Sequence, residues 1–92
     1  ERAILDFEQA IELDPTYAKA YNNRGIIHVK NNALDPAVRD FDKAIELDPG
    51  YAQAYKNRGI AYKKKGNADQ AIRDREKAVE LDPRNAGAAP QR

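Results

Sequence analysis

The chain has 92 residues, of which 41% are hydrophobic and 34% charged, and its formal net charge is +1. This length allows one small domain, and the net charge by itself indicates neither a nucleic-acid nor a membrane partner. No apolar run approaches the ~20 residues of a membrane helix, and no segment has the pattern of a signal peptide. The compartment therefore stays open, with the cytoplasm as the default. Cys and Met are absent, which excludes disulfides and thiolate metal sites, and a chain that starts at Glu1 without Met is expected to be part of a longer one.

The sequence repeats itself with a period of 34 residues. When Tyr17–Gly50 is aligned with Tyr51–Arg84, 19 of 34 positions are identical. The motif AIELDP at Ala10–Pro15 recurs at Ala44–Pro49, and as AVELDP at Ala78–Pro83. A fixed period in this range is typical of a solenoid, in which each unit buries its apolar face only against its neighbours.

In chain order, each unit predicts two helices. In the second helix of a unit, apolar residues such as Ala37, Val38 and Phe41 recur at helical spacing and form one stripe. An Asp-Pro pair closes each such helix, because the residue before proline is disfavoured in the α region. The predicted helices are Glu1–Leu13, Tyr17–Asn31, Asp35–Leu47, Tyr51–Lys65 and Asp69–Leu81.

Short breakers separate the two helices of a unit. Gly66, and Asn32 at the equivalent place one unit earlier, are suited to a left-handed helix terminus. Asp35 followed by Pro36 predicts a helix start, with the Asp as N-cap and the Pro at the first helical position. A glycine inside a helix is unfavourable by about 1 kcal/mol relative to alanine, so Gly25 and its counterpart one period later predict a neighbouring helix that needs the room.

This pattern resembles the tetratricopeptide repeat, a 34-residue helix–turn–helix unit. The resemblance implies an all-α fold, a right-handed α-solenoid of antiparallel helix pairs with five helices. It makes residues 1–84 a single solenoid segment, with a half repeat at 1–15 and full repeats at 18–51 and 52–85, and leaves 86–92 as a frayed or disordered tail. The matching positions are Tyr21, Gly25, Ala37, Phe41, Ala44, Pro49, Tyr55, Gly59, Tyr62, Ala71, Ala78 and Pro83.

Arginine stands at Arg24 and Arg58, where the family usually has leucine. We expect each aliphatic stem to pack and each guanidinium to reach the surface or a carboxylate. Asp40 and Asp74 recur with the same period and are the predicted partners.

Two further departures concern single residues. Arg75 stands where Phe41 stands one unit earlier, and because an unpaired buried charge is strongly destabilising, Arg75 is expected to be exposed at the end of the array. His28 replaces the aromatic seen at Tyr62, and we expect a partly buried ring. A single His without Cys is a poor metal site, so no metal or cofactor is expected.

The residue types of catalytic sites are nearly absent. There is no serine, no cysteine and no glycine-rich loop, and Thr16 is the only threonine. The carboxylates lie beside Lys or Arg on periodic helix faces, as a solvated charged surface does. The sequence therefore predicts that the chain is not an enzyme.

Charge is segregated between the two kinds of helix. The helices predicted at Tyr17–Asn31 and Tyr51–Lys65 carry eight basic residues and no acidic one. The other three carry twelve acidic and six basic residues. The small net charge thus hides a strong separation of sign.

By the family resemblance, the basic helices line the concave groove of the solenoid and the acidic ones form its back. The groove would then bind a peptide or protein segment, preferably an acidic one, with lysines that make association salt-dependent and asparagines that hydrogen-bond its backbone. Two alternatives stay open: a structural spacer, or an excised or engineered fragment, with no ligand of its own, and, less favoured because groove aromatics are sparse, single-stranded RNA binding. The groove positions are Lys19, Asn22, Asn23, Ile26, Val29, Lys30, Gln53, Lys56, Asn57, Ile60, Lys63 and Lys64.

Two further expectations concern partners. One branch of the family clamps chaperone carboxylates, but Ile26 and Ile60 occupy the position of the clamp's first asparagine and the third helix of the clamp is missing, so chaperone binding is not assigned. The first helix lacks the helix it would normally pack against. Its face with Ile4, Phe7 and Ile11 is therefore expected to be partly uncovered and to allow pairing with a second copy.

Overall fold

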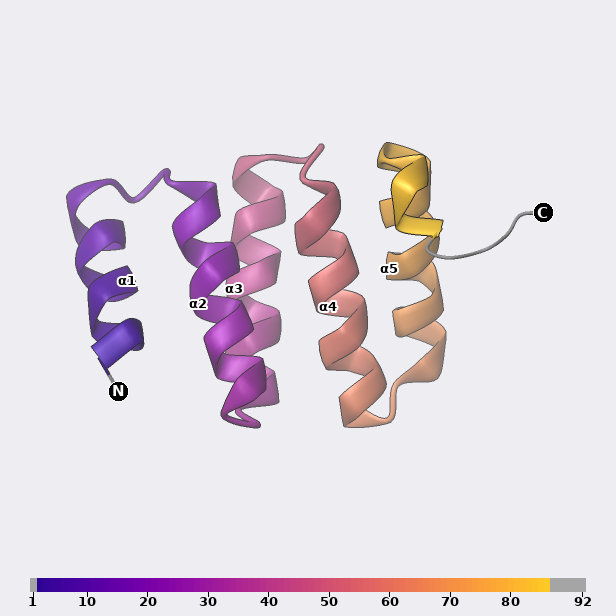
Figure 1. Cartoon of the computed structure of the whole chain (residues 1–92), viewed down its shortest axis with the longest axis horizontal. Coiled ribbons are helices and arrows are strands. Elements are labelled where there is room, and N and C mark those ends of the chain that lie inside the picture. Colours follow the sequence, from indigo (N-terminus) through magenta and orange to yellow (C-terminus); the bar gives the residue numbers. More distant parts are fainter. Residues whose placement is uncertain (1, 87–92) are drawn as a thin grey trace.

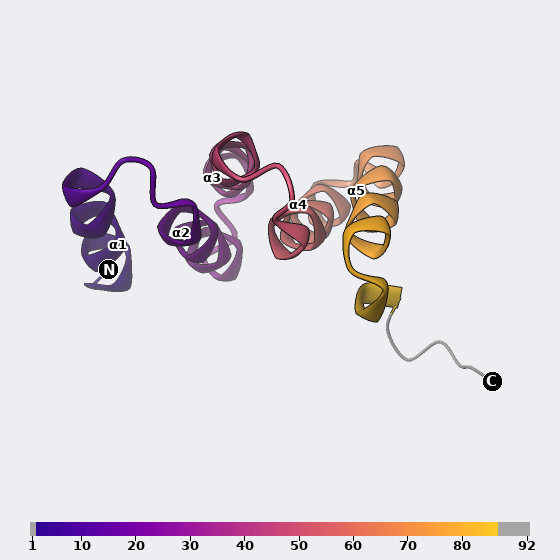
Figure 2. The ribbon, with the colours of Figure 1, turned by 90° about the horizontal axis from the view of Figure 1, so that it is seen from above.

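The computed structural model describes residues 2–86, which form a row of antiparallel helices without a strand (Figure 1). Each helix packs on the next one along the chain. Seen from above, α3 and α5 lie in one row and α2 and α4 in the other (Figure 2). The all-α solenoid prediction is confirmed. The elements are α1 (Arg2–Leu13), α2 (Ala18–Lys30), α3 (Leu34–Leu47), α4 (Ala52–Lys65), α5 (Ala68–Leu81) and the short 3₁₀ helix η1 (Pro83–Ala86).

The core lies where α3 meets α2 and α4. Phe41, Ala37 and Val38 of α3 are buried together with Ala61 of α4. The ring of Phe41 lies so close to α2 that a Cβ on Gly25 would come within 2.5 Å of it. The glycine therefore provides the close approach that its place in the repeat predicts.

The helix ends follow the repeated turn chemistry. Gly66 (φ 88°) and Asn32 (φ 60°) adopt the left-handed conformation, as predicted. At the Asp-Pro corners the aspartate has a further role, because its side chain accepts a hydrogen bond from the backbone two residues later. Asp48 accepts from the N–H of Gly50 at 3.2 Å, and Asp14 and Asp82 do the same in their turns.

One predicted helix start is wrong. Helix α3 begins at Leu34 with Ala33 as its N-cap, so Asp35 and Pro36 are its second and third residues. The first helical hydrogen bond runs from Ala37 N–H to the carbonyl of Ala33. Pro36 still fits, because the first N–H groups of a helix have no partner inside it. The equivalent residue in the other repeat, Asn67, is a true side-chain N-cap for α5.

The two ends of the row are less well covered than its centre. None of the residues of α1 is fully buried, and Leu13 is 83% exposed, in agreement with the expected open face. Arg75 is exposed, as predicted. The division into residues 1–84 and a tail stays a prediction, and the tail beyond Ala86 lies outside the described residues.

Candidate functional site

Both repeats contain the same partly buried ion pair between their two helices. Arg24 of α2 binds Asp40 of α3 with two hydrogen bonds of 2.8 and 2.6 Å, and Arg58 of α4 binds Asp74 of α5 with two of 2.8 Å. The hydrogen bond to the partner carboxylate is the largest cause that raises the pKa of each arginine. The predicted pairing is confirmed, and these guanidiniums hold each helical hairpin together.

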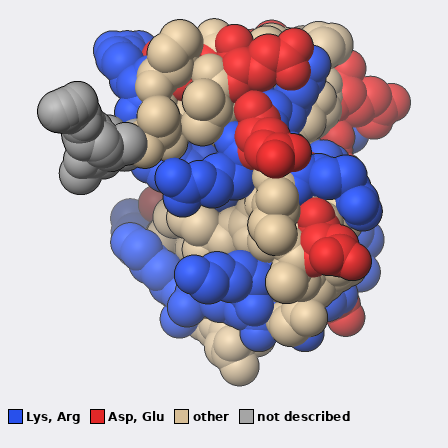
Figure 3. All heavy atoms as spheres, turned by 90° about the vertical axis from the view of Figure 1, so that its right-hand side faces the viewer, with Lys and Arg blue, Asp and Glu red and all other residues tan. Residues whose placement is uncertain are grey.

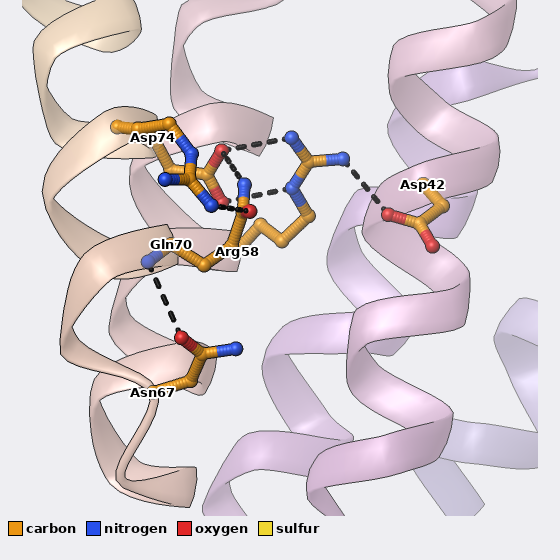
Figure 4. Close-up of polar contacts among 6 residues, drawn as sticks. Asp42, Arg58, Asn67, Gln70 and Asp74 are labelled. Carbon is orange, nitrogen blue, oxygen red and sulfur yellow. Dashed lines mark hydrogen bonds and ion pairs between the residues drawn. The ribbon is translucent and has the colours of Figure 1, made fainter.

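Arg58 also joins one repeat to the previous one. Its third nitrogen donates to Asp42 of α3 at 2.8 Å, so the guanidinium lies between carboxylates of two repeats (Figure 4). It also lies 5.4 Å from the ring centroid of Tyr55. With every side of the group occupied, Arg58 is a structural residue rather than a ligand-binding one.

His28 lies beside the first of these ion pairs. Its ring is partly buried, as predicted, and Nε2 is 3.6 Å from Asp40. In residues 2–86, no group of three His, Cys, Asp or Glu side chains is placed to hold a metal ion.

The predicted groove residues differ widely in accessibility. The structure corrects the prediction that Asn22 faces the groove. Asn22 is only 4% exposed, and its side-chain carbonyl oxygen accepts a hydrogen bond of 3.1 Å from Asn57 of the next repeat. Burial raises the pKa of the nearby Tyr51 phenol, and the Asn22 side chain acts in the opposite direction. Asn22 therefore connects the two repeats instead of facing a ligand. The half-buried positions are Asn23, Ile26, Val29 and Asn57, and the exposed ones are Lys19, Lys30, Gln53, Lys56, Ile60, Lys63 and Lys64.

Two hollows bring part of the predicted set together. A shallow one of about 180 Å³ lies between α2 and α4, with Ile26, Val29 and Lys30 on one side and Asn57 and Ile60 on the other. A larger one of about 510 Å³ lies between α4 and α5 and includes Lys56, Ile60 and Lys63. The remaining accessible positions, Lys19, Asn23, Gln53 and Lys64, line neither.

Sequence reasoning missed the other wall of the larger hollow. Ile72 and Arg75 of α5 line it with three alanines and Asn85 of η1. The sequence did contain a sign of this wall, because Arg75 stands where Phe41 stands one repeat earlier. From that difference we predicted only that Arg75 is exposed, not that it lines a hollow.

The lysines of α2 and α4 differ from the arginines in having no acidic partner. Among the described residues, Lys19, Lys30, Lys56, Lys63 and Lys64 form no ion pair. Lys65 is the exception, because its ammonium group binds Asp35 of α3. Helices α2 and α4 thus have five uncompensated cations beside Ile26, Val29 and Ile60, and this set is the candidate site.

Family models and solved structures agree on the kind of repeat. The model "Tetratricopeptide repeat" matches residues 18–51 and 52–85, and a second model, "TPR repeat", matches residues 1–32. A search of curated proteins gave no match. No helix in residues 2–86 has the length and apolarity to cross a membrane.

Solved structures with the same arrangement come from several proteins. A crystal structure of MamA is 34% identical with a TM-score of 0.82, over 90% of this chain and 48% of that one. YrrB, described as having an unusual peptide-binding site, is 31% identical (TM-score 0.79), over 84% of this chain and 40% of that one. The first TPR of Spaghetti (RPAP3), bound to the HSP90 peptide SRMEEVD, is 26% identical (TM-score 0.85), over 87% and 64%. This chain therefore spans about half the length of MamA.

Proposed function

Because the chain belongs to the tetratricopeptide repeat family, we propose that it is a protein-interaction module that binds an acidic peptide segment along the basic face of α2 and α4. The observation that carries this proposal is the set of five lysines without acidic partners in the described residues. Uncompensated cations on one face attract a ligand of opposite sign and speed its association.

The apolar part of the face supports a peptide as the ligand. Ile26, Val29 and Ile60 meet in the shallow hollow between α2 and α4, where they can cover apolar side chains of a bound segment. The amide of Asn23 is half-buried and can hydrogen-bond a peptide backbone. A face with this mixture favours a peptide that carries acidic and apolar residues.

The lysines are exposed, which limits what each contributes. An exposed ion pair is worth about 0.2–1 kcal/mol, and salt screens it. The sum over five lysines therefore supports a modest affinity that falls as salt rises. YrrB and the Spaghetti (RPAP3) domain are peptide-binding relatives, and the latter's peptide has three acidic side chains. For this chain, Ile26 and Ile60 argue against the same chaperone-tail clamp.

A binding assay with charge-reversed variants tests the proposal. The probe is a fluorescein-labelled acidic–apolar peptide, and its affinity is measured by anisotropy at two salt concentrations. We expect Lys19→Glu/Lys30→Glu to weaken binding and to flatten its salt dependence. The control Lys43→Glu/Lys77→Glu makes the same charge change on α3 and α5 and is expected to retain binding.

The outcomes separate the alternatives. Equal loss in both double variants would show an unspecific charge effect and contradict the groove. Binding of a single-stranded oligonucleotide in preference to the peptide would favour RNA, and binding of neither would favour a spacer without a ligand.

Self-association through α1 is a separate prediction. The half-buried Ile4, Phe7 and Ile11 lie beside the exposed Leu5 and Leu13, and such a face favours pairing with a second copy. Sedimentation at several chain concentrations tests this, and Leu5→Asp is expected to reduce any dimer. A monomer throughout would contradict it.

A further inference from the structure

The larger hollow lies between α4 and α5 at the α5 end of the row, and Lys56, Ile60 and Lys63 of α4 belong both to it and to the face of α2 and α4. Figure 3 views this end and shows an uncharged surface in its middle, with basic side chains around much of it and acidic ones above it and on the right. The hollow has a volume of about 510 Å³. It is lined by Lys56, Gly59, Ile60, Lys63, Ala68, Ala71, Ile72, Arg75, Ala78 and Asn85.

The same surface one repeat earlier is covered by a helix. Val38 of α3 is 8% exposed, because α4 packs on it, whereas Ile72, its equivalent on α5, is 54% exposed. Phe41 is fully buried in a cluster with Ala61 of α4, whereas its equivalent Arg75 is exposed. The hollow therefore has the shape that receives α4 in the preceding repeat, and in the described residues only η1 follows α5.

The charge of the lining selects what can enter. Three of the ten lining residues are cations, Lys56, Lys63 and Arg75, and none is acidic. A helix that covered Arg75 with apolar residues alone would bury an unpaired guanidinium, which is strongly unfavourable. An occupant must therefore bring a carboxylate to Arg75 while it covers Ile60 and Ile72.

We propose that this hollow binds an amphipathic helix of a partner protein, with an apolar face on Ile60 and Ile72 and a carboxylate paired with Arg75. Residues 87–92 contain no acidic side chain, so they bring no side-chain carboxylate to Arg75. The contact is a second one, beyond the peptide groove of the proposed function, and the two share Lys56, Ile60 and Lys63.

The contacts of α4 specify the partner helix further. Arg58 and Lys65 of α4 bind Asp42 and Asp35 of α3. One period later the same positions on α5 are Glu76 and Asp69. A partner helix is thus expected to keep two cations at these places and to carry its carboxylate where α4 has Ala61.

A synthetic peptide reproduces this pattern. It copies Tyr51–Lys65 with Lys56, Ala61, Lys63 and Lys64 each replaced by Glu, and it keeps Arg58 and Lys65. The unaltered copy of Tyr51–Lys65 is the control peptide. We expect the acidic peptide to bind the chain and to gain helical circular dichroism on binding, and the control peptide to bind at least about tenfold more weakly.

Variants of the chain place the binding site. Ile72→Asp is exposed on α5 and is expected to weaken binding of the acidic peptide at least about tenfold, with Leu5→Asp on α1 as the matched control that retains it. Arg75→Glu is expected to reverse the preference between the two peptides. Lys19→Glu/Lys30→Glu is expected to keep its affinity for the helical peptide and to lose its affinity for the acidic–apolar peptide of the proposed function. The two proposals can therefore be refuted independently.

Three results would overturn the proposal: equal affinity of the two peptides, unchanged affinity in Ile72→Asp, or binding without added helix. The proposal would also be overturned if the mass of the protein in solution rose with chain concentration and Ile72→Asp abolished this rise, because a second copy of the chain would then occupy the hollow. Far-UV circular dichroism of each variant confirms that a lost affinity is not a lost fold.

Discussion

Replacing Gly25 by alanine tests the closest helix approach in the core. The new Cβ would lie 2.5, 2.8 and 2.9 Å from three ring carbons of Phe41. The ring is fully buried and packed on three helices, so it cannot turn away without displacing its neighbours. Overpacking costs about 1–3 kcal/mol, and three contacts this short favour the upper end. Alanine regains about 1 kcal/mol of helix propensity, so we expect a net loss near 2 kcal/mol.

The assay is urea denaturation followed by far-UV circular dichroism. A loss near 2 kcal/mol is a large part of the ~5–15 kcal/mol available to a small domain. Gly50→Ala is the matched control: its nearest outside atom is 3.8 Å away and its φ is not positive, so we expect no loss. Adding Phe41→Leu to Gly25→Ala should recover part of the deficit relative to the sum of the single changes. Equal stability of Gly25→Ala and the parent chain would refute the argument.

The remaining predictions concern the carboxylates. Asp74→Ala leaves the partly buried Arg58 with only an exposed partner, so we expect it to lower the free energy of unfolding by about 3 kcal/mol. Asp42→Ala should lower it by less than about 1 kcal/mol, because the Asp42 side chain is 51% exposed and that of Asp74 only 3%. Urea midpoints compare the two, and equal losses would contradict the assignment. The hydrogen bond from Lys65 lowers the pKa of Asp35. Its contribution to stability is thus complete above the unfolded pKa of about 3.9 and is lost as the pH falls through the lower folded pKa. Asp35→Asn should therefore lose less stability than the parent chain between about pH 4 and pH 2, and parallel stability–pH curves would argue against this.

The period of 34 residues was sufficient to predict the helices and their ion pairs. When two copies keep Arg24 with Asp40 and Arg58 with Asp74, the spacing places both partners across the same helical hairpin in each copy. Left-handed termini at Asn32 and Gly66 followed for a similar reason, because local backbone chemistry decides them. Most features that depend on one hairpin, or on one turn, were therefore predictable, and the start of α3 is the exception.

Features that depend on the angle between repeats were not. The family resemblance placed Asn22 in the groove, but the approach of α4 buries it against Asn57. The hollow beside Ile72 could not be predicted either, because its prediction requires knowing which residues of α3 are covered by α4 one repeat earlier.

Comparison of equivalent positions separates two explanations of Arg75. A capping surface of a solenoid is polar across its whole face, and on that explanation the residues around Arg75 would be polar as well. Instead Ile60 and Ile72 stay apolar while 41% and 54% exposed, and the hollow beside them has three cations and no carboxylate. Among the core positions of α3, only Phe41 has a charged equivalent in α5, and on α4 Lys63 stands where Val29 packs against the core one repeat earlier. Cations beside exposed apolar residues select the helix that covers them, which is what a specific binding surface requires and a uniformly polar cap does not.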